Sequence, residues 1–331
     1  MNRLSRLRLW RAALAGVIAA CAGAPSPAWS QGFPTRPLRI IEQFNNGAPG
    51  DVLFRVIAVQ VGELLGQPVI VDSRSGAGGV VAAGAVVRSA ADGYTLFGGN
   101  STVPVVSVVL SKTPPPFDPG KDLIPLTTVA DIATLLVANA SLPANNLREV
   151  IEYAKANPGK VSYGSTGIGS PQHLAGEEIN VLTGAGMMHV PYKTSPVLDA
   201  ASGALQLSFA VSAQAMPLIK TGKVKLVAVL ADSRFAPMPE VPTIAEALPG
   251  FDSPPRWTGL FVPAGVPAPI VRRLHADFVR AINSPEGRAR ILDTGFEPMT
   301  NKSPEEFAAL IKSQIELVAR IVKTARIPKS D

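Results

Sequence analysis

The chain has 331 residues, enough for two domains of ordinary size. Hydrophobic residues make up 47% of it and charged residues 17%, a composition that excludes intrinsic disorder and supports a sizeable core. The formal net charge is +6, but the first 31 residues hold four arginines and no acid, so the rest carries 27 basic against 25 acidic residues. That near balance gives no indication of a nucleic-acid or membrane-surface partner.

The N-terminus predicts an export signal. Four arginines precede a run of small apolar residues at 12–24, which is too short to span a bilayer. Ala28 and Ser30 occupy the two positions that signal peptidase reads, so we expect cleavage after Ser30 and a periplasmic protein. An alternative is a lipoprotein signal, because Ile-Ala-Ala precedes Cys21.

The remaining cysteine and histidine content argues against metal chemistry. Cys21 is the only cysteine and is predicted to leave with the signal, so no disulfide is expected. His173, His189 and His275 are scattered without ligand spacing. No metal site and no cofactor are therefore predicted.

Strands alternate with helices along the first part of the chain, and each strand ends in a polar or glycine-rich loop. Asp51 is predicted to cap a helix that runs through Leu65 and is closed by Gly66. The predicted strands lie at 38–44, 69–72 and 94–98, and their loops at 45–51, 75–79 and 99–101.

Two apolar strands, at 124–129 and 134–138, follow each other almost directly, and the chain is expected to cross from one domain to the other between them. The alternation then continues to the C-terminus, which predicts α/β layers with mostly parallel sheets. Further strands are predicted at 161–163, 188–190, 205–210, 225–230 and 257–262, and further helices at 147–156, 170–182, 197–201, 269–283, 285–294 and 304–324.

The stretch 161–173 is the most informative part of the sequence. A short strand leads into a loop with Gly164, Gly167 and Gly169, and Ser170-Pro171 then forms a typical helix start. Backbone N–H groups at such a helix start are suited to a carboxylate. The alternative is a tight turn that needs glycine for geometry alone. Because ligands collect beyond the carboxyl ends of parallel strands, the loops at 45–51, 99–101 and 164–170 together favour binding.

With these loops, the chain resembles the Bug-type receptors, which are the TctC-like periplasmic solute-binding subunits of tripartite tricarboxylate transporters. The resemblance covers residues 34–327. The segments that carry it are 37–40 (PLRI), 65–69 (LGQPV), 76–79 (GAGG), 92–96 (DGYTL), 156–160 (ANPGK), 163–173, 189–193 (HVPYK) and 263–265 (PAG).

The resemblance implies a type II periplasmic binding protein-like fold, with two α/β lobes around a ligand cleft and a hinge. The first lobe would comprise 31–131 plus 253–331, and the second 132–252. The implied partners are a small organic (carboxylic) acid and the permease subunits of a membrane transporter. The protein is expected to be a monomer that binds without catalysis.

The resemblance also implies the residues that line the cleft, with the carboxylate held between loops of the two lobes. His173 fits a structural role as well as a ligand contact. The predicted residues are Phe44, Asn45, Asn46, Gly47, Ala48, Asp51, Asn100, Ser101, Ser165, Thr166, Gly167, Gly169, Ser170, His173, Ala210 and Ser212.

The first loop departs from the family pattern. Gln43 precedes Phe44, two asparagines replace a small residue and a proline, and Pro49 lacks an N–H to donate. The asparagine amides can act as donors instead. Ala210 stands where relatives often carry an acid, which argues against an amino-acid ligand.

Two other functions are compatible with parts of the sequence. A secreted hydrolase would use Ser165 or Ser170 as nucleophile and His173 as base, but no Gly-x-Ser-x-Gly elbow is present and no orienting acid is evident. A periplasmic sensor subunit would bind its ligand by the same physics as a transport receptor, and the sequence does not separate the two.

Overall fold

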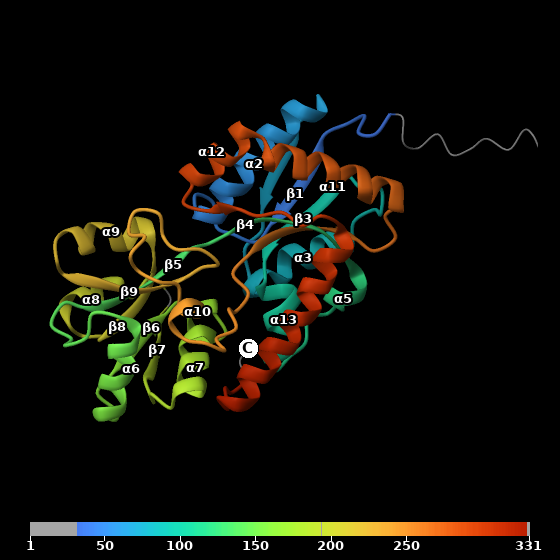
Figure 1. Ribbon diagram of the computed structural model, residues 1–331. Helices are drawn as coiled ribbons and strands as arrows, with labels where there is room; N and C mark the ends of the chain where they lie inside the picture. Colours follow the sequence, from blue (N-terminus) through green and yellow to red (C-terminus); the bar gives the residue numbers. More distant parts are fainter. Residues whose placement is uncertain (1–31, 193, 330–331) are drawn as a thin grey trace, which may run out of the picture. The chain divides into compact units, whose positions relative to one another are not determined.

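The computed structural model describes residues 32–192 and 194–329 (Figure 1). The predicted signal peptide, its cleavage site and Cys21 lie outside these residues. From Arg36 onward the described residues form one compact unit that contains two β-sheets.

The first sheet has six strands in the order β11-β4-β10-β3-β1-β2. β1 pairs in parallel with β2 on one side and β3 on the other, so the carboxyl ends of these three strands share one edge. β10 runs antiparallel to both of its neighbours. The strands are β1 (Leu38–Glu42), β2 (Val69–Ser73), β3 (Thr95–Asn100), β4 (Leu123–Asp131), β10 (Thr258–Pro263) and β11 (Glu297–Pro298).

Helices cover both faces of this sheet (Figure 1). One face carries α2 (Pro49–Leu65), α11 (Ala268–Asn283) and α12 (Pro285–Asp293). On the other face, rings of Trp257, Phe261 and Phe307 pack together, with Phe261 and Phe307 centroids 5.3 Å apart. That face carries η1 (Ala77–Gly79), α3 (Val80–Val87), η2 (Thr102–Val106), α4 (Ser107–Leu110), α5 (Pro119–Asp122) and α13 (Pro304–Thr324).

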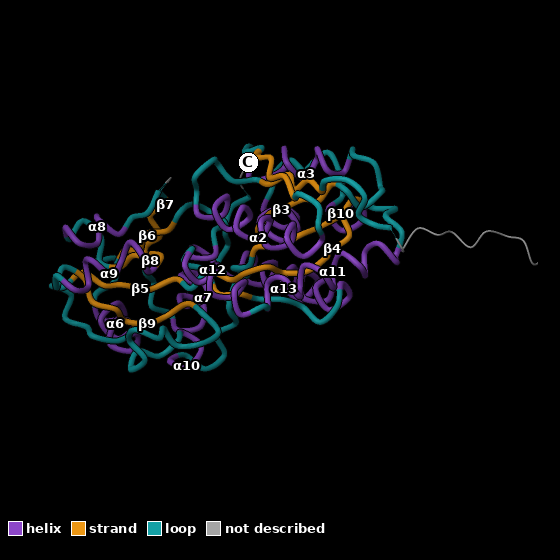
Figure 2. The backbone as a smooth tube through the Cα atoms, turned by 90° about the horizontal axis from the view of Figure 1, so that it is seen from above, coloured by secondary structure: helices purple, strands orange, loops and turns teal. Residues whose placement is uncertain are grey.

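The second sheet has five strands in the order β7-β6-β8-β5-β9 (Figure 2). Two hydrophobic clusters lie on its two faces, one under α6, α7 and α10 and the other under α8 and α9. The strands are β5 (Thr134–Asn139), β6 (Ser162–Ser165), β7 (Met188–Pro191), β8 (Leu207–Val211) and β9 (Val224–Leu230). The helices are α6 (Leu147–Ala156), α7 (Pro171–Thr183), α8 (Val197–Ser202), α9 (Ser212–Lys220) and α10 (Ile244–Ala247).

Two expectations about local structure need correction. The sheets are mixed rather than mostly parallel, because β5, β10 and β11 run against their neighbours; hydrophobic periodicity carries no information on strand direction. The helix expected to start with Asp51 as cap begins earlier, at Pro49, with Ala48 as N-cap. Proline suits the first helical position, and this places Asp51 inside the first turn.

The chain passes between the two sheets twice, and one arginine contacts both passages. Only residues 132 and 133 separate β4 from β5, whereas a long proline-containing segment joins β9 to β10. In that segment the buried Arg256 pairs with Asp131 (Nη2–Oδ2 2.5 Å) and with Asp232 (Nη2–Oδ1 2.9 Å). The lobe boundaries given above stay a prediction.

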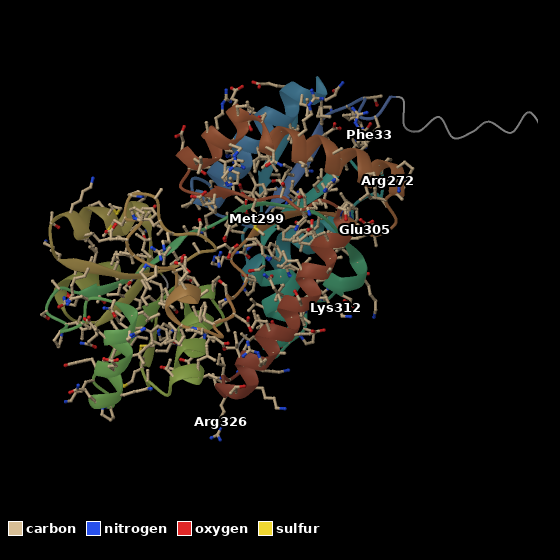
Figure 3. The ribbon with its side chains drawn as sticks, in the orientation of Figure 1. Phe33, Arg272, Met299, Glu305, Lys312 and Arg326 are labelled. Carbon is tan, nitrogen blue, oxygen red and sulfur yellow. The ribbon has the colours of Figure 1, made fainter. Side chains whose placement is uncertain are left out.

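None of the helices among the described residues combines the length and the apolar character that a membrane crossing requires. α13, for example, packs Phe307, Val318 and Ile321 into the core, while Glu305 and Lys312 on the same helix are exposed (Figure 3).

Candidate functional site

Side chains join the loops that follow β1 and β3. Gln43 Nε2 donates to Asn100 Oδ1 (2.9 Å), and the Asn100 N–H donates back to Gln43 Oε1 (3.2 Å). The Thr102 N–H donates to the same Asn100 oxygen (3.0 Å). The turn after β2 packs here too, since a Cβ at Gly79 would lie 2.6 Å from Gln43 Oε1. The structure thus brings together the two first-lobe loops that the sequence analysis singled out, through a glutamine that it did not include.

The Asp51 side chain is buried beneath the first loop, residues 45–51, and binds groups of the protein instead of facing solvent. Its side chain is 3% exposed, and its carboxylate accepts hydrogen bonds from the Gly47 N–H (2.8 Å), Ser73 Oγ (3.0 Å) and Arg55 Nε (3.0 Å). Burial opposes ionisation, but these three donors together hold the pKa of Asp51 below its usual value. Both oxygens are therefore occupied inside the protein.

Glu42, which the sequence analysis did not include, is a second buried carboxyl under this loop. It is fully buried at the end of β1 and accepts a hydrogen bond from the Phe44 N–H. Its Oε1 has no hydrogen-bond partner among the described residues. Burial raises the pKa of Glu42, and the nearby charge of Asp51 adds to the effect. The underside of the loop thus holds two buried carboxyl groups.

Ser165 and Ser170 organise the second loop, residues 164–170, which joins β6 to α7. Ser170 caps α7 as predicted, because its Oγ accepts from the His173 N–H (3.2 Å). Ser165 is fully buried; its Oγ accepts from the Gly167 N–H (3.1 Å) and lies 2.7 Å from His189 Nε2. The loop conformation thus depends on the hydroxyl of Ser165.

Two stacked histidines lie behind this loop. The rings of His173 and His189 have centroids 3.9 Å apart and an interplanar angle of 25°. His173 Nδ1 accepts the Gly169 N–H (3.0 Å) and so carries no proton. Burial lowers the pKa of His173 to about 3, with a contribution from His189, and burial lowers the pKa of His189 to about 4. Both rings are neutral at ordinary pH.

These contacts do not favour the hydrolase alternative. The lone pair that would make His173 a base is used by Gly169, and Ser165 pairs with His189 instead. Ser165 is also closed to solvent, and no carboxylate among the described residues hydrogen-bonds His189.

The N–H groups that remain for a ligand belong to exposed residues. Those of Gly47, Gly167 and Gly169 are used internally, as described above. Within the described part of the chain, no hydrogen bond uses the backbone N–H of four exposed residues at the loop tips. These are Asn45, Asn46, Thr166 and Ile168.

The other predicted site residues differ in how accessible they are. Phe44 just before the first loop and Ala48 within it are half-buried, as is Ser212 at the start of α9. Ser101 turns inward, where its Oγ donates to the Pro255 carbonyl (3.1 Å), and Ala210 is 3% exposed within the core. For all sixteen predicted residues, contact with a ligand stays a prediction.

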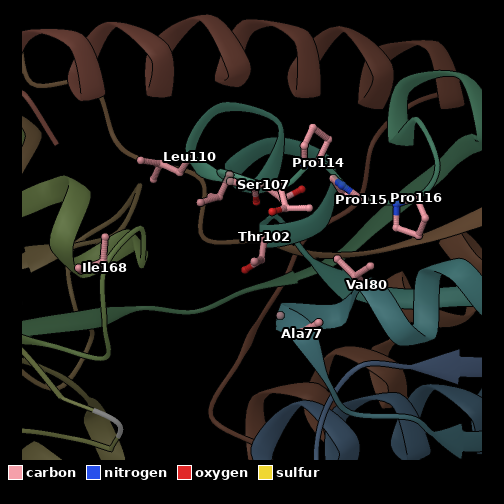
Figure 4. Close-up of a pocket in the computed structure, with 13 residues that line it drawn as sticks. Ala77, Val80, Thr102, Ser107, Leu110, Pro114, Pro115, Pro116 and Ile168 are labelled. Carbon is pink, nitrogen blue, oxygen red and sulfur yellow. The ribbon is translucent and has the colours of Figure 1, made fainter. Parts of the chain in front are cut away.

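A pocket of about 520 Å³ opens beside these loops (Figure 4). The turn after β2 contributes Ala77 and Gly78, and the helical segment after β3 contributes Thr102, Val106 and Leu110. The second loop adds Ile168. The sequence analysis missed most of this lining, because apolar residues such as Val106 and Leu110 do not differ in pattern from core residues.

Residues 53–327 match the model of the tripartite tricarboxylate transporter family receptors, TctC. The chain belongs to this family. The resemblance to Bug-type receptors is confirmed as well, since the chain is 33% identical to Protein BugT of Bordetella pertussis over 94% of this chain and 96% of that protein.

Solved structures confirm the fold class. The R. palustris protein Rpa4515, with adipate, is 31% identical and superposes with a TM-score of 0.75 over 89% of this chain and 99% of that one. MatC from Rhodopseudomonas palustris, with bound malate, is 31% identical, with a TM-score of 0.69 over 88% of this chain and 100% of that one. The chain thus has the two-lobed α/β architecture of periplasmic solute-binding proteins.

Proposed function

We propose that this TctC receptor is a periplasmic solute-binding protein that captures a small organic carboxylate. The observation that carries the proposal is the similarity, over almost the whole chain, to a structure that holds adipate and to another that holds malate. Both of those ligands are carboxylates, and the loops of this chain after β1 and β6 present unused N–H groups, with asparagine amides in the first of them.

Capture follows from contacts with loops of both lobes. A ligand shifts an open–closed equilibrium only by the difference between its affinities for the two states. The unused N–H groups of Asn45 and Asn46 follow a strand of the first sheet, and those of Thr166 and Ile168 follow a strand of the second. A carboxylate that contacts both sets would therefore be bound more tightly when the lobes close on it. No bond in the ligand is made or broken in this proposal.

The cellular role that we propose follows from the family. Residues 1–30 would direct export to the periplasm, where the monomeric receptor delivers its ligand to membrane permease subunits of a tripartite tricarboxylate transporter. The description of the family as transporter receptors supports this role over that of a sensor subunit.

Substitutions in the two loops test the capture site. Asn46→Ala and Ser165→Ala are each expected to raise the Kd for a bound carboxylate by about 5- to 30-fold, the equivalent of about 1–2 kcal/mol for one hydrogen bond to a charged group. Asn46 loses an exposed amide donor, and Ser165 loses the hydroxyl that positions Gly167. Isothermal titration calorimetry of the chain from residue 31, against a panel of mono- and dicarboxylates, measures the effect.

Asn283→Ala is a matched control, because Asn283 is an exposed asparagine of α11 whose side-chain amide donates to Thr300 Oγ1, and it lies outside the predicted site. The Kd of Asn283→Ala for the bound carboxylate is expected to equal that of the native chain. Native affinity in both loop variants would contradict this placement of the site, and the absence of heat with every carboxylate would contradict the function itself.

A further inference from the structure

The pocket beside the loops is lined by uncharged residues. Val106 and Leu110 line it only by their edges, since they are 7% and 2% exposed and pack against Gly169 of the second loop, whereas the three consecutive prolines at 114–116 present a more exposed apolar wall. The polar members of the described lining are hydroxyl residues, among them Thr102 and Ser107. No aspartate, glutamate, lysine, arginine or histidine contributes to it.

An uncharged apolar lining discriminates between ligands by their second functional group. A second carboxylate at this wall would have neither a cation nor the unused backbone N–H groups that the loop tips offer to the first, so its lost hydration would be poorly compensated. A methylene chain or a ring loses only unfavourable contact with water. The pocket therefore favours ligands with a single charged end.

Ile168 connects this pocket to the predicted carboxylate contacts. Its side chain is 45% exposed and reaches the pocket, while its own backbone N–H has no hydrogen bond among the described residues (Figure 4). One residue thus offers a donor for a carboxylate head and an apolar surface for the atoms that follow it.

We propose that the ligand of this receptor is a monocarboxylate with an extended apolar body, and that Ile168 is a specificity-determining residue for that body. The inference rests on the proposed function. The head contacts the exposed N–H groups of the loops, and the body lies between Ile168 and the wall formed by Val106, Leu110 and the prolines. A diacid or hydroxy-diacid of the same length is disfavoured, because its second polar end would meet this wall.

Calorimetry with butyrate, pentanoate, hexanoate, adipate and malate tests the proposal on the chain from residue 31. Affinity is expected to rise about fourfold for each added methylene, which corresponds to the usual gain for one buried CH₂. Hexanoate is expected to bind at least about tenfold more tightly than adipate. Ile168→Ser is expected to reduce the hexanoate-to-butyrate affinity ratio about threefold or more.

Leu198→Ser is the control for this variant, because Leu198 is a 68% exposed leucine on α8 and does not contribute to the lining. Leu198→Ser should leave the hexanoate-to-butyrate affinity ratio equal to that of the native chain. Tighter binding of adipate or malate than of hexanoate, equal affinity along the series, or a native ratio in Ile168→Ser would each overturn the inference and leave carboxylate capture standing. No binding of any of the five acids would overturn the proposed function, and this inference with it.

Discussion

Arg256→Met is expected to lower the free energy of unfolding by about 3 kcal/mol, the lower end of the usual cost of breaking a buried ion pair. Only 4% of the Arg256 side chain is exposed, and it pairs with Asp131, whose side chain is 13% exposed. Methionine retains the apolar stem but leaves Asp131 without its cation. Urea unfolding, followed by tryptophan fluorescence, measures the change.

Arg234→Met is the matched control for Arg256→Met. Arg234 also pairs with an acid, Glu246, but about half of each side chain is exposed, so its removal is expected to cost less than about 1 kcal/mol. The double variant Arg256→Met/Asp131→Leu should recover most of the lost stability, because it removes the unpaired charge. Equal losses in the two single variants would show that burial of the Arg256 pair has no consequence for stability.

Acidification is expected to destabilise the protein through its two stacked histidines. Both have folded-state pKa values, about 3 and about 4, below the 6.5 of an ordinary histidine, so the unfolded chain binds protons first as the pH falls. The stability that each histidine contributes is complete above pH 6.5 and is lost progressively as the pH falls, down to about pH 4 for His189 and about pH 3 for His173. At pH 5 each histidine accounts for a loss of about 2 kcal/mol, at about 1.4 kcal/mol per pH unit.

His173→Asn tests this assignment, because its side-chain oxygen can accept the Gly169 N–H without titrating. The difference in unfolding free energy between pH 7.5 and pH 5 should shrink by about 2 kcal/mol relative to the native chain. Ser170→Ala, at the same helix start, is expected to cost about 1 kcal/mol at both pH values, since a serine cap does not titrate. An unchanged pH dependence in His173→Asn would refute the role given to His173.

Local signals predicted the helix ends well. The helix at 147–156 was predicted with the boundaries that the structure shows, and Gly66 ends α2 in the left-handed conformation (φ 64°) that glycine allows. Such signals act over a few residues and can be recognised in a single sequence. The direction of strands β5 and β10 could not be predicted, because it depends on how segments distant in the sequence pair.

The candidate site was predictable only in part. The loops after β1 and β3 were both recognisable in the sequence. They meet because β1 and β3 pair in parallel as adjacent strands. The contact between Ser165 and His189, 24 residues later, was not predictable. A serine hydroxyl fits equally well against a buried partner or against solvent. The same holds for Gln43, whose partner Asn100 lies 57 residues away.

The two-residue passage from β4 to β5 has a mechanical consequence for a receptor that closes on its ligand. In this short passage, rotation of one sheet against the other would be absorbed by the backbone torsions around Ile132 and Ala133, because the Ile132 N–H is bonded to the Asp131 carboxylate and Arg256 anchors that aspartate. A hinge of only a few residues can absorb a large rotation. Closure of the proposed receptor would therefore be concentrated at these two residues, with the longer segment from β9 to β10 following.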